Sequence, residues 1–186
     1  MRTMGAETTR LTYEAYLELP ETKRRYDTVD GVLEYRSPSP TQSHQRVLGN
    51  LFLALHSFVD QGKLGEVYLA PLDIIISKRP LQTRQPDLMF ISRARVDLSK
   101  DQIETPPDVV IEILSPANTP KKLQAKLDDY ASLGVPEVWV AAPAAETLEV
   151  SRLERGKYRS AGICSAGSPV NTEVLSGFIL PKDVFA

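Results

Sequence analysis

Two acidic residues stand inside or directly before apolar runs, where packing alone does not account for them. Glu112 lies within residues 109–114, whose other members are all apolar, and Asp87 directly precedes the apolar run 88–91. Both runs are typical of strands buried on both faces. A carboxylate in such a dry strand costs several kcal/mol unless it is neutralised, hydrogen-bonded or bound to a cation. Two acids on two buried strands therefore indicate a metal site.

A lysine on the next predicted helix is directed toward the same region. Residues 120–133 begin with Pro120 and are followed by Gly134, which is typical of the two ends of a helix. At about 100° per residue, Lys126 falls inside an apolar arc formed by Leu123, Leu127, Tyr130, Ala131 and Leu133. Either Lys126 points at the strand that carries Glu112, or its stem follows the core edge and its ammonium group stays in water. The spacing alone favours the second interpretation.

The remaining pattern predicts a mixed α/β domain, with a central sheet covered on both sides by helices. A long helix is expected to start at a cap formed by Thr41 or Ser43 and to end at Gly62. Further elements are expected as a short helix at 12–19, a hairpin at 25–35 around Asp30-Gly31, strands at 67–77 and 137–142, a hairpin of 148–153 with 157–163, and a final strand through Phe178. Asp73 would lie at the centre of its strand, and residues 78–85 read as a polar loop.

Composition limits the class of protein. The chain has 186 residues, a formal net charge of -2 and an apolar fraction of 42%, which predicts one domain over residues 11–186 after a loose N-terminus at 1–10. The charge excludes a global basic field for nucleic acid, so such a contact would need a local patch. The single cysteine, Cys164, excludes an internal disulfide and fits a reducing compartment. We expect a cytoplasmic protein, because no leader and no apolar run of about 18 residues is seen.

Several motifs occur in a characteristic order. They are Thr12-Tyr13-Glu14, Tyr26 through Gly31, His44-Gln45, Pro86-Asp87, Glu112 with Leu114-Ser115-Pro116, Lys126 with Tyr130, and Gly134-Val135-Pro136-Glu137-Val138-Trp139. Together they resemble the Uma2 family (DUF820), a group of restriction-endonuclease-like proteins within the PD-(D/E)XK nuclease superfamily. The resemblance extends from about residue 11 to the end of the sequence.

The resemblance implies a restriction-endonuclease-like fold, in which a mixed central β-sheet is flanked by helices. In that superfamily, acids hold Mg²⁺ or Mn²⁺ beside the scissile phosphate, and a lysine orients or deprotonates the attacking water. Carried over to this sequence, Asp87 matches the first acid and Glu112 the second. The backbone carbonyl of Ile113 is expected as a further metal ligand.

The sequence departs from the superfamily pattern at two positions. The strict motif has a lysine two residues after the second acid, where this chain has Leu114. The resemblance places the cation on the following helix instead, at Lys126, which the helical arc also singles out. The family usually has glutamate where this chain has Asp27. Asp27 is either an accessory acid or an ordinary carboxylate of the hairpin.

Two further residues are candidates for accessory roles. His44, near the start of the long helix, either faces the active cleft or makes only a local hydrogen bond there. Asp73 is either a third acid that points into the same cleft or a strand carboxylate held by an ion pair. The sequence leaves both choices open.

Two functions from different classes are consistent with these residues. The first is a Mg²⁺-dependent endonuclease that cleaves DNA with Asp87, Glu112 and Lys126, acting as a homodimer or higher homo-oligomer because one site cuts one strand. The second is a catalytically inactive domain on the same fold that binds nucleic acid or protein. Hydrolysis of another phosphodiester is a third reading. The retention of both acids and the cation favours the nuclease.

Overall fold

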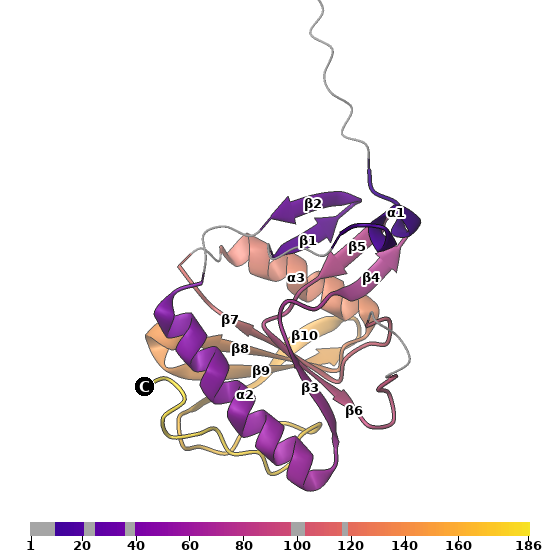
Figure 1. Ribbon diagram of the computed structural model, residues 1–186. Coiled ribbons are helices and arrows are strands. Elements are labelled where there is room, and N and C mark those ends of the chain that lie inside the picture. The colour runs from indigo at the N-terminus through magenta and orange to yellow at the C-terminus, as the bar shows by residue number, and fades with distance from the viewer. Residues whose placement is uncertain (1–9, 21–24, 36–39, 98–102, 117–118) are drawn as a thin grey trace, which may run out of the picture.

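The computed structural model describes residues 10–20, 25–35, 40–97, 103–116 and 119–186, and Figure 1 shows its ribbon. Apart from Arg10, the expected loose N-terminus lies outside the described residues. Within the described part, the strands form one four-stranded sheet and one six-stranded sheet. No helix there combines the length and the apolar character of a membrane span.

The larger sheet is the expected mixed sheet. Its strand order is β10-β9-β8-β7-β6-β3, with bounds β3 Gly65–Leu69, β6 Leu88–Ser92, β7 Val109–Ile113, β8 Glu137–Ala142, β9 Thr147–Glu154 and β10 Lys157–Ser165. Strands β7 and β8 are parallel, and the other neighbours are antiparallel. A parallel pair needs a crossover connection, which is the helix α3 (Pro120–Leu133).

The smaller sheet was not predicted. Its order is β2-β1-β5-β4, with bounds β1 Tyr26–Val29, β2 Val32–Tyr35, β4 Ile74–Lys78 and β5 Leu81–Arg84. The predicted hairpin around Asp30-Gly31 is confirmed, because β1 and β2 pair across it. Both turn residues have positive φ, 51° and 75°, as a two-residue hairpin turn requires. Figure 1 shows this sheet beside α1 (Tyr13–Leu17) and separate from the larger sheet.

Helices cover both faces of the larger sheet. Helix α2 (Gln42–Gly62) places Val47 and Leu51 in one buried cluster with Ile111 of β7. On the opposite face, Tyr130 of α3 packs with Val110. Side chains alternate along β7, as they do in any strand. Glu112 therefore lies on the same face as Val110, toward α3.

The helix ends follow from local sequence. Thr41 caps α2 by accepting a hydrogen bond from the His44 N–H, and Thr119 caps α3 in the same way. Gly134 ends α3 in the left-handed region with φ 82°. Helix α2 runs through Gly62, and Lys63 is its left-handed cap. Thr41, not Ser43, is thus the cap of the long helix.

Three expected elements differ from the structure. The predicted strand 67–77 is two strands in two sheets, because Pro71 lies between β3 and β4 and has no N–H to donate to a ladder. Residues 78–85 contain β5, whose polar side chains are buried among partners that the sequence does not reveal. The predicted final strand is an isolated bridge between Pro169 and Ile179.

Candidate active site

Asp87 and Glu112 belong to neighbouring segments of the larger sheet. In the antiparallel pair of β6 and β7, Leu88 lies opposite Ile111. Asp87 directly precedes β6, Glu112 directly follows Ile111 in β7, and the Ile113 N–H donates to Asp87 Oδ2. Both acids are buried, at 3% and 2% exposure. The fold thus brings together the two acids that the sequence singled out.

Asp87 is held by partners from three separate segments. Its Oδ1 accepts hydrogen bonds from Arg25 Nη1 and Nη2, each at 3.1 Å. Its Oδ2 accepts the Ile113 N–H at 2.9 Å and lies 3.2 Å from His44 Nε2. Burial alone would raise the pKa of Asp87, but the hydrogen bond and charge of His44, the charge of Arg25 and the Ile113 N–H together hold that pKa well below its usual range. Asp87 is therefore ionised at neutral pH.

Glu112 is held by two residues of α3. Lys126 Nζ lies 2.6 Å from Oε2, and the Tyr130 hydroxyl donates to Oε1 at 2.6 Å. The two donors are one helical turn apart and therefore project from the same side of α3. Lys126 is only 8% exposed, so its ammonium group is not in bulk water. The structure therefore agrees with the first interpretation, in which Lys126 points at the strand that carries Glu112.

Asp27 lies in a buried polar cluster next to this pair of acids. Its Oδ1 accepts the Gln85 N–H at 3.0 Å, and its Oδ2 lies 3.4 Å from Arg84 Nη1. Arg25 also donates to the Gln85 carbonyl, at 3.2 Å. A path of hydrogen bonds therefore leads from Asp87 through Arg25 and Gln85 to Asp27. Asp27 is more than an exposed hairpin carboxylate, because it is 6% exposed.

Asp73 lies in the loop directly before β4, and its carboxylate interacts with Thr83, Gln85 and Asp27. The Tyr16 hydroxyl of α1 donates to its Oδ2 at 2.7 Å. Burial raises the pKa of Asp73, against the lowering effect of the Tyr16 hydrogen bond, and the charge of Asp27 raises it further. The structure therefore associates Asp73 with α1 and Asp27, and its role as an accessory acid remains a prediction.

The site also contains residues that the sequence did not single out. Arg25 contacts Asp87, Tyr130 donates to Glu112, and Arg84 connects the small sheet to α3 through Asp129, at 2.6 Å. The hydroxyl of a buried tyrosine normally needs a partner, so Tyr130 within the apolar arc carried a signal. Nothing in the local sequence of Arg25 or Arg84 indicates which carboxylate each would meet, because their partners lie far along the chain.

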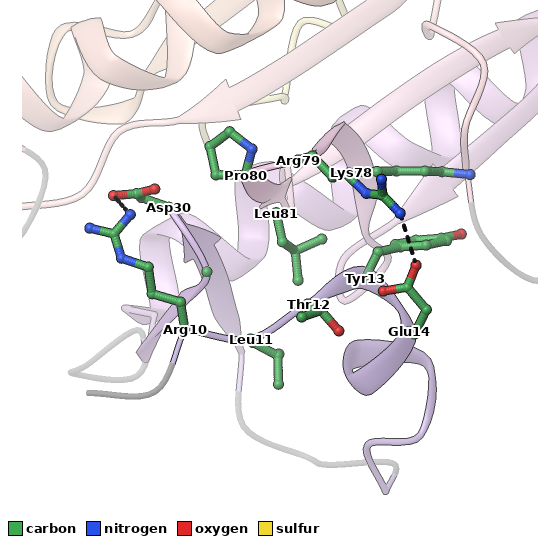
Figure 2. A pocket seen from close by; sticks show the side chains of 11 residues that line it. Arg10, Leu11, Thr12, Tyr13, Glu14, Asp30, Lys78, Arg79, Pro80 and Leu81 are labelled. Atoms are coloured by element: carbon green, nitrogen blue, oxygen red, sulfur yellow. Dashed lines mark ion pairs between the residues drawn. The ribbon is translucent and has the colours of Figure 1, made fainter. Parts of the chain in front are cut away.

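A cavity of about 410 Å³ lies between the start of α1 and the two hairpin turns of the smaller sheet. Figure 2 shows its lining side chains, which come from Arg10, Leu11, Thr12, Tyr13, Glu14, Asp30, Gly31, Lys78, Arg79, Pro80 and Leu81. Its charged groups are paired with one another or with neighbours: Arg10 with Asp30, Arg79 with Glu14, and Lys78 with Glu104. Neither Asp87 nor Glu112 lines it.

Comparison with known proteins decides the family. The sequence profile described as "Uma2: Putative restriction endonuclease" matches residues 13–182. The chain belongs to the Uma2 family. A solved structure from Anabaena variabilis, described as a putative nuclease belonging to DUF820, shares the fold with a TM-score of 0.76 at 20% identity, covering 94% of this chain and 97% of that one. No curated protein matches the chain.

Membership of Uma2 confirms the restriction-endonuclease-like fold and indicates a nuclease. Nucleases with this fold generally use divalent metals, so the donor set has to be tested for its fit to one. Within the described residues, no three His, Cys, Asp or Glu side chains are grouped as a complete metal cage. Mg²⁺ does not need such a cage, because it is usually held by one or two carboxylates together with water and substrate phosphates. Two buried carboxylates in neighbouring segments, Asp87 and Glu112, are the type of donor that such an open site uses.

Proposed function

We propose that this Uma2 protein is a divalent-metal-dependent endonuclease that hydrolyses phosphodiester bonds of DNA. The observation that carries the proposal is the burial of Asp87 and Glu112 in neighbouring segments, with the Ile113 N–H bonded to Asp87 and Lys126 bonded to Glu112. A fold alone does not establish an activity. An acid pair buried together with a cation is expensive to maintain without a function, and it is of the right chemistry for phosphoryl transfer.

In this proposal, Asp87, Glu112 and the carbonyl oxygen of Ile113 would hold Mg²⁺, with Mn²⁺ as an alternative. Bound there, the metal would supply Lewis-acid polarisation of the scissile phosphate and would make the attacking water more acidic. Lys126 orients or deprotonates the attacking water and stabilises the negative charge that develops. His44 fixes the orientation of Asp87 through its Nε2 contact. Asp27 and Asp73 act as accessory acids through the polar cluster.

The proposal extends to assembly and location. Cleavage of a duplex requires two sites, one for each strand, so the protein is proposed to act as a homodimer or higher homo-oligomer. Measurement of its mass in solution tests this: a strictly monomeric protein would contradict duplex cleavage by a pair of sites. A single cysteine in the sequence suits a reducing compartment, which supports a cytoplasmic location.

One observation favours a second function, that of a catalytically inactive nucleic-acid-binding or protein-interaction domain. All four carboxylate oxygens of Asp87 and Glu112 already have hydrogen-bond donors from the protein. In an inactive descendant, these contacts would serve only to stabilise the fold. The two functions differ in what happens to Asp87 and Glu112 when metal is added.

Calorimetric titration of Mg²⁺ and Mn²⁺ into the purified protein tests the proposal. We expect binding that is lost in Glu112→Gln, which removes the charge while nearly preserving the volume. The same variant should also fail to cleave plasmid DNA. If the wild type binds neither metal, even with DNA present, the inactive domain is the correct reading.

The chain offers a matched control in Glu137, a second buried strand glutamate. It is 1% exposed and accepts hydrogen bonds from Trp139 Nε1 and the Thr172 hydroxyl. Its partners are therefore structural. Glu137→Gln should lower stability and leave metal binding intact. Equal loss of metal binding in both variants would mean that the effect comes from the fold and not from the site.

A further inference from the structure

We propose that Arg25 is a residue with two alternating partners, paired with Asp87 in the metal-free protein and with the substrate phosphate once Asp87 holds the metal. This inference rests on the proposed function, because it requires metal and a phosphodiester at the same site. It assigns a substrate-binding role to a residue that lies outside the acids and the lysine.

The first observation is that Arg25 donates two hydrogen bonds to one carboxylate oxygen of Asp87. Both Nη1 and Nη2 donate to the same oxygen, Oδ1, at 3.1 Å. The other oxygen, Oδ2, is taken by the Ile113 N–H and His44. A metal that binds Asp87 through Oδ1 therefore competes directly with the guanidinium of Arg25.

The second observation concerns the third nitrogen of the Arg25 guanidinium, Nε. Its Nε is buried and has no hydrogen-bond partner within the described part of the chain. Buried polar groups are nearly always satisfied, so this N–H marks a place for an acceptor. A guanidinium binds phosphate side-on through two parallel N–H groups. Arg25 can offer Nε and one Nη in this way without a new donor having to be built.

The third observation is accessibility. The Arg25 side chain is 18% exposed, whereas that of Asp87 is 4% exposed. Arg25 is thus the more accessible member of the pair, and within its guanidinium Nε is buried. Arg84 makes an instructive contrast, because its side chain is 7% exposed and bridges two carboxylates, those of Asp27 and Asp129. Arg25 pairs with the carboxylate of Asp87, and its further hydrogen bond goes to the neutral carbonyl of Gln85.

Charge explains why the partner would change. In the metal-free protein, Arg25 with Asp87 and Lys126 with Glu112 form two neutral pairs. A divalent cation on the two carboxylates adds positive charge close to Arg25 and weakens its attraction to Asp87. A phosphodiester held by that metal brings the nearest new negative charge. Arg25 then pairs with the phosphodiester in place of Asp87, which now binds the metal.

The test measures metal affinity and DNA affinity separately, with Arg25→Met, Arg25→Lys and a control. In Mn²⁺ titrations without DNA, Arg25→Met should bind the metal roughly tenfold more tightly than the wild type, because one charged hydrogen-bonded competitor is gone. Its affinity for a DNA duplex in Ca²⁺, at fixed salt, should fall by a similar factor. Arg25→Lys keeps the charge but loses the fork, so its DNA affinity should also fall. Arg10→Met, which removes an exposed pair with Asp30, should change neither quantity.

Each outcome has a definite meaning. Metal binding by Arg25→Met that equals or is weaker than that of the wild type overturns the inference and leaves the proposed function standing. If neither protein binds Mn²⁺, with DNA absent or present, both are overturned. If Arg25→Met binds Mn²⁺ without DNA and the wild type binds it only with DNA present, both are supported. Should Arg25→Met fail to fold by circular dichroism, Arg25→Lys decides: unchanged DNA affinity in that variant overturns the inference, and a loss of DNA affinity with metal binding retained supports it.

Discussion

Lys126 of α3 and Glu112 of β7 form a buried ion pair, with 2.6 Å between Nζ and Oε2 and side-chain exposures of 10% and 3%. The pair joins the crossover helix to the centre of the larger sheet. The Tyr130 hydroxyl donates a hydrogen bond to the other carboxylate oxygen of Glu112, Oε1. Each of the two charges offsets the free-energy cost of removing the other from water.

Replacing Lys126 by Met should therefore be costly to the fold. It leaves Glu112 buried without a counter-charge, and breaking a buried pair on one side costs about 3–5 kcal/mol. Urea unfolding of Lys126→Met measures this loss. Turnover should fall more than metal affinity, because Lys126 is not itself a metal ligand in the proposed site.

The double variant Lys126→Met with Glu112→Gln is the control for this prediction. It removes both charges, so it should recover much of the stability that Lys126→Met loses. A loss of less than about 1 kcal/mol in Lys126→Met would contradict the buried pair, because that is the value of an exposed one.

Tyr130→Phe should lower stability without removing any charge. It deletes a buried hydroxyl that donates to a carboxylate, and hydrogen bonds to charged groups contribute about 1.5–3 kcal/mol. Tyr158→Phe is a matched control, since the Tyr158 hydroxyl donates to the neutral Val135 carbonyl at 2.8 Å. A neutral hydrogen bond contributes about 0.5–1.5 kcal/mol. Equal losses in the two variants would mean that the charge of Glu112 adds nothing to the Tyr130 contact.

The sequence predicted the elements whose signal is local. The hairpin at Asp30-Gly31, the ends of α3 and the burial of the β7 strand each depend on neighbouring residues, and the structure has all three. It also singled out the two acids and the lysine, because charged groups in apolar patterns are conspicuous. The fold then placed Asp87 beside the strand that carries Glu112, through a hydrogen bond from the Ile113 N–H that no local pattern specifies.

The parts that were missed depend on contacts between distant segments. Strand β5 reads as a polar loop because Arg84 is buried only by virtue of its acidic partners on β1 and α3. Arg25 reaches Asp87 across 62 positions of sequence. Polarity in such segments is indistinguishable from that of a solvated loop until the partners are known. The continuous strand through Asp73 failed for a different reason, because Pro71 separates β3 from β4.

The low pKa of Asp87 makes a prediction for acid unfolding. Its pKa in the folded state lies below the unfolded value of about 3.9, so the ionised carboxylate contributes stability at and above that pH. This contribution is lost as the pH falls from about 4 through the lower folded pKa. Urea unfolding at a series of pH values should show this loss in the wild type. Asp87→Asn should show a shallower dependence below pH of about 4, and parallel curves for the two proteins would contradict the assignment.

Asp73 should have the opposite effect on stability. Its pKa is raised in the folded state, chiefly by burial, so the folded protein holds the proton more tightly than the unfolded chain. Stability from this group is present below the unfolded pKa of about 3.9 and is lost as the pH rises through the folded value. Asp73→Asn keeps an oxygen to accept the Tyr16 hydroxyl and cannot ionise. We expect it to be more stable than the wild type at neutral pH, with an advantage that disappears in acid. A variant that is less stable at neutral pH would show that the charge of Asp73 is needed, as it would be in an accessory acid of the site.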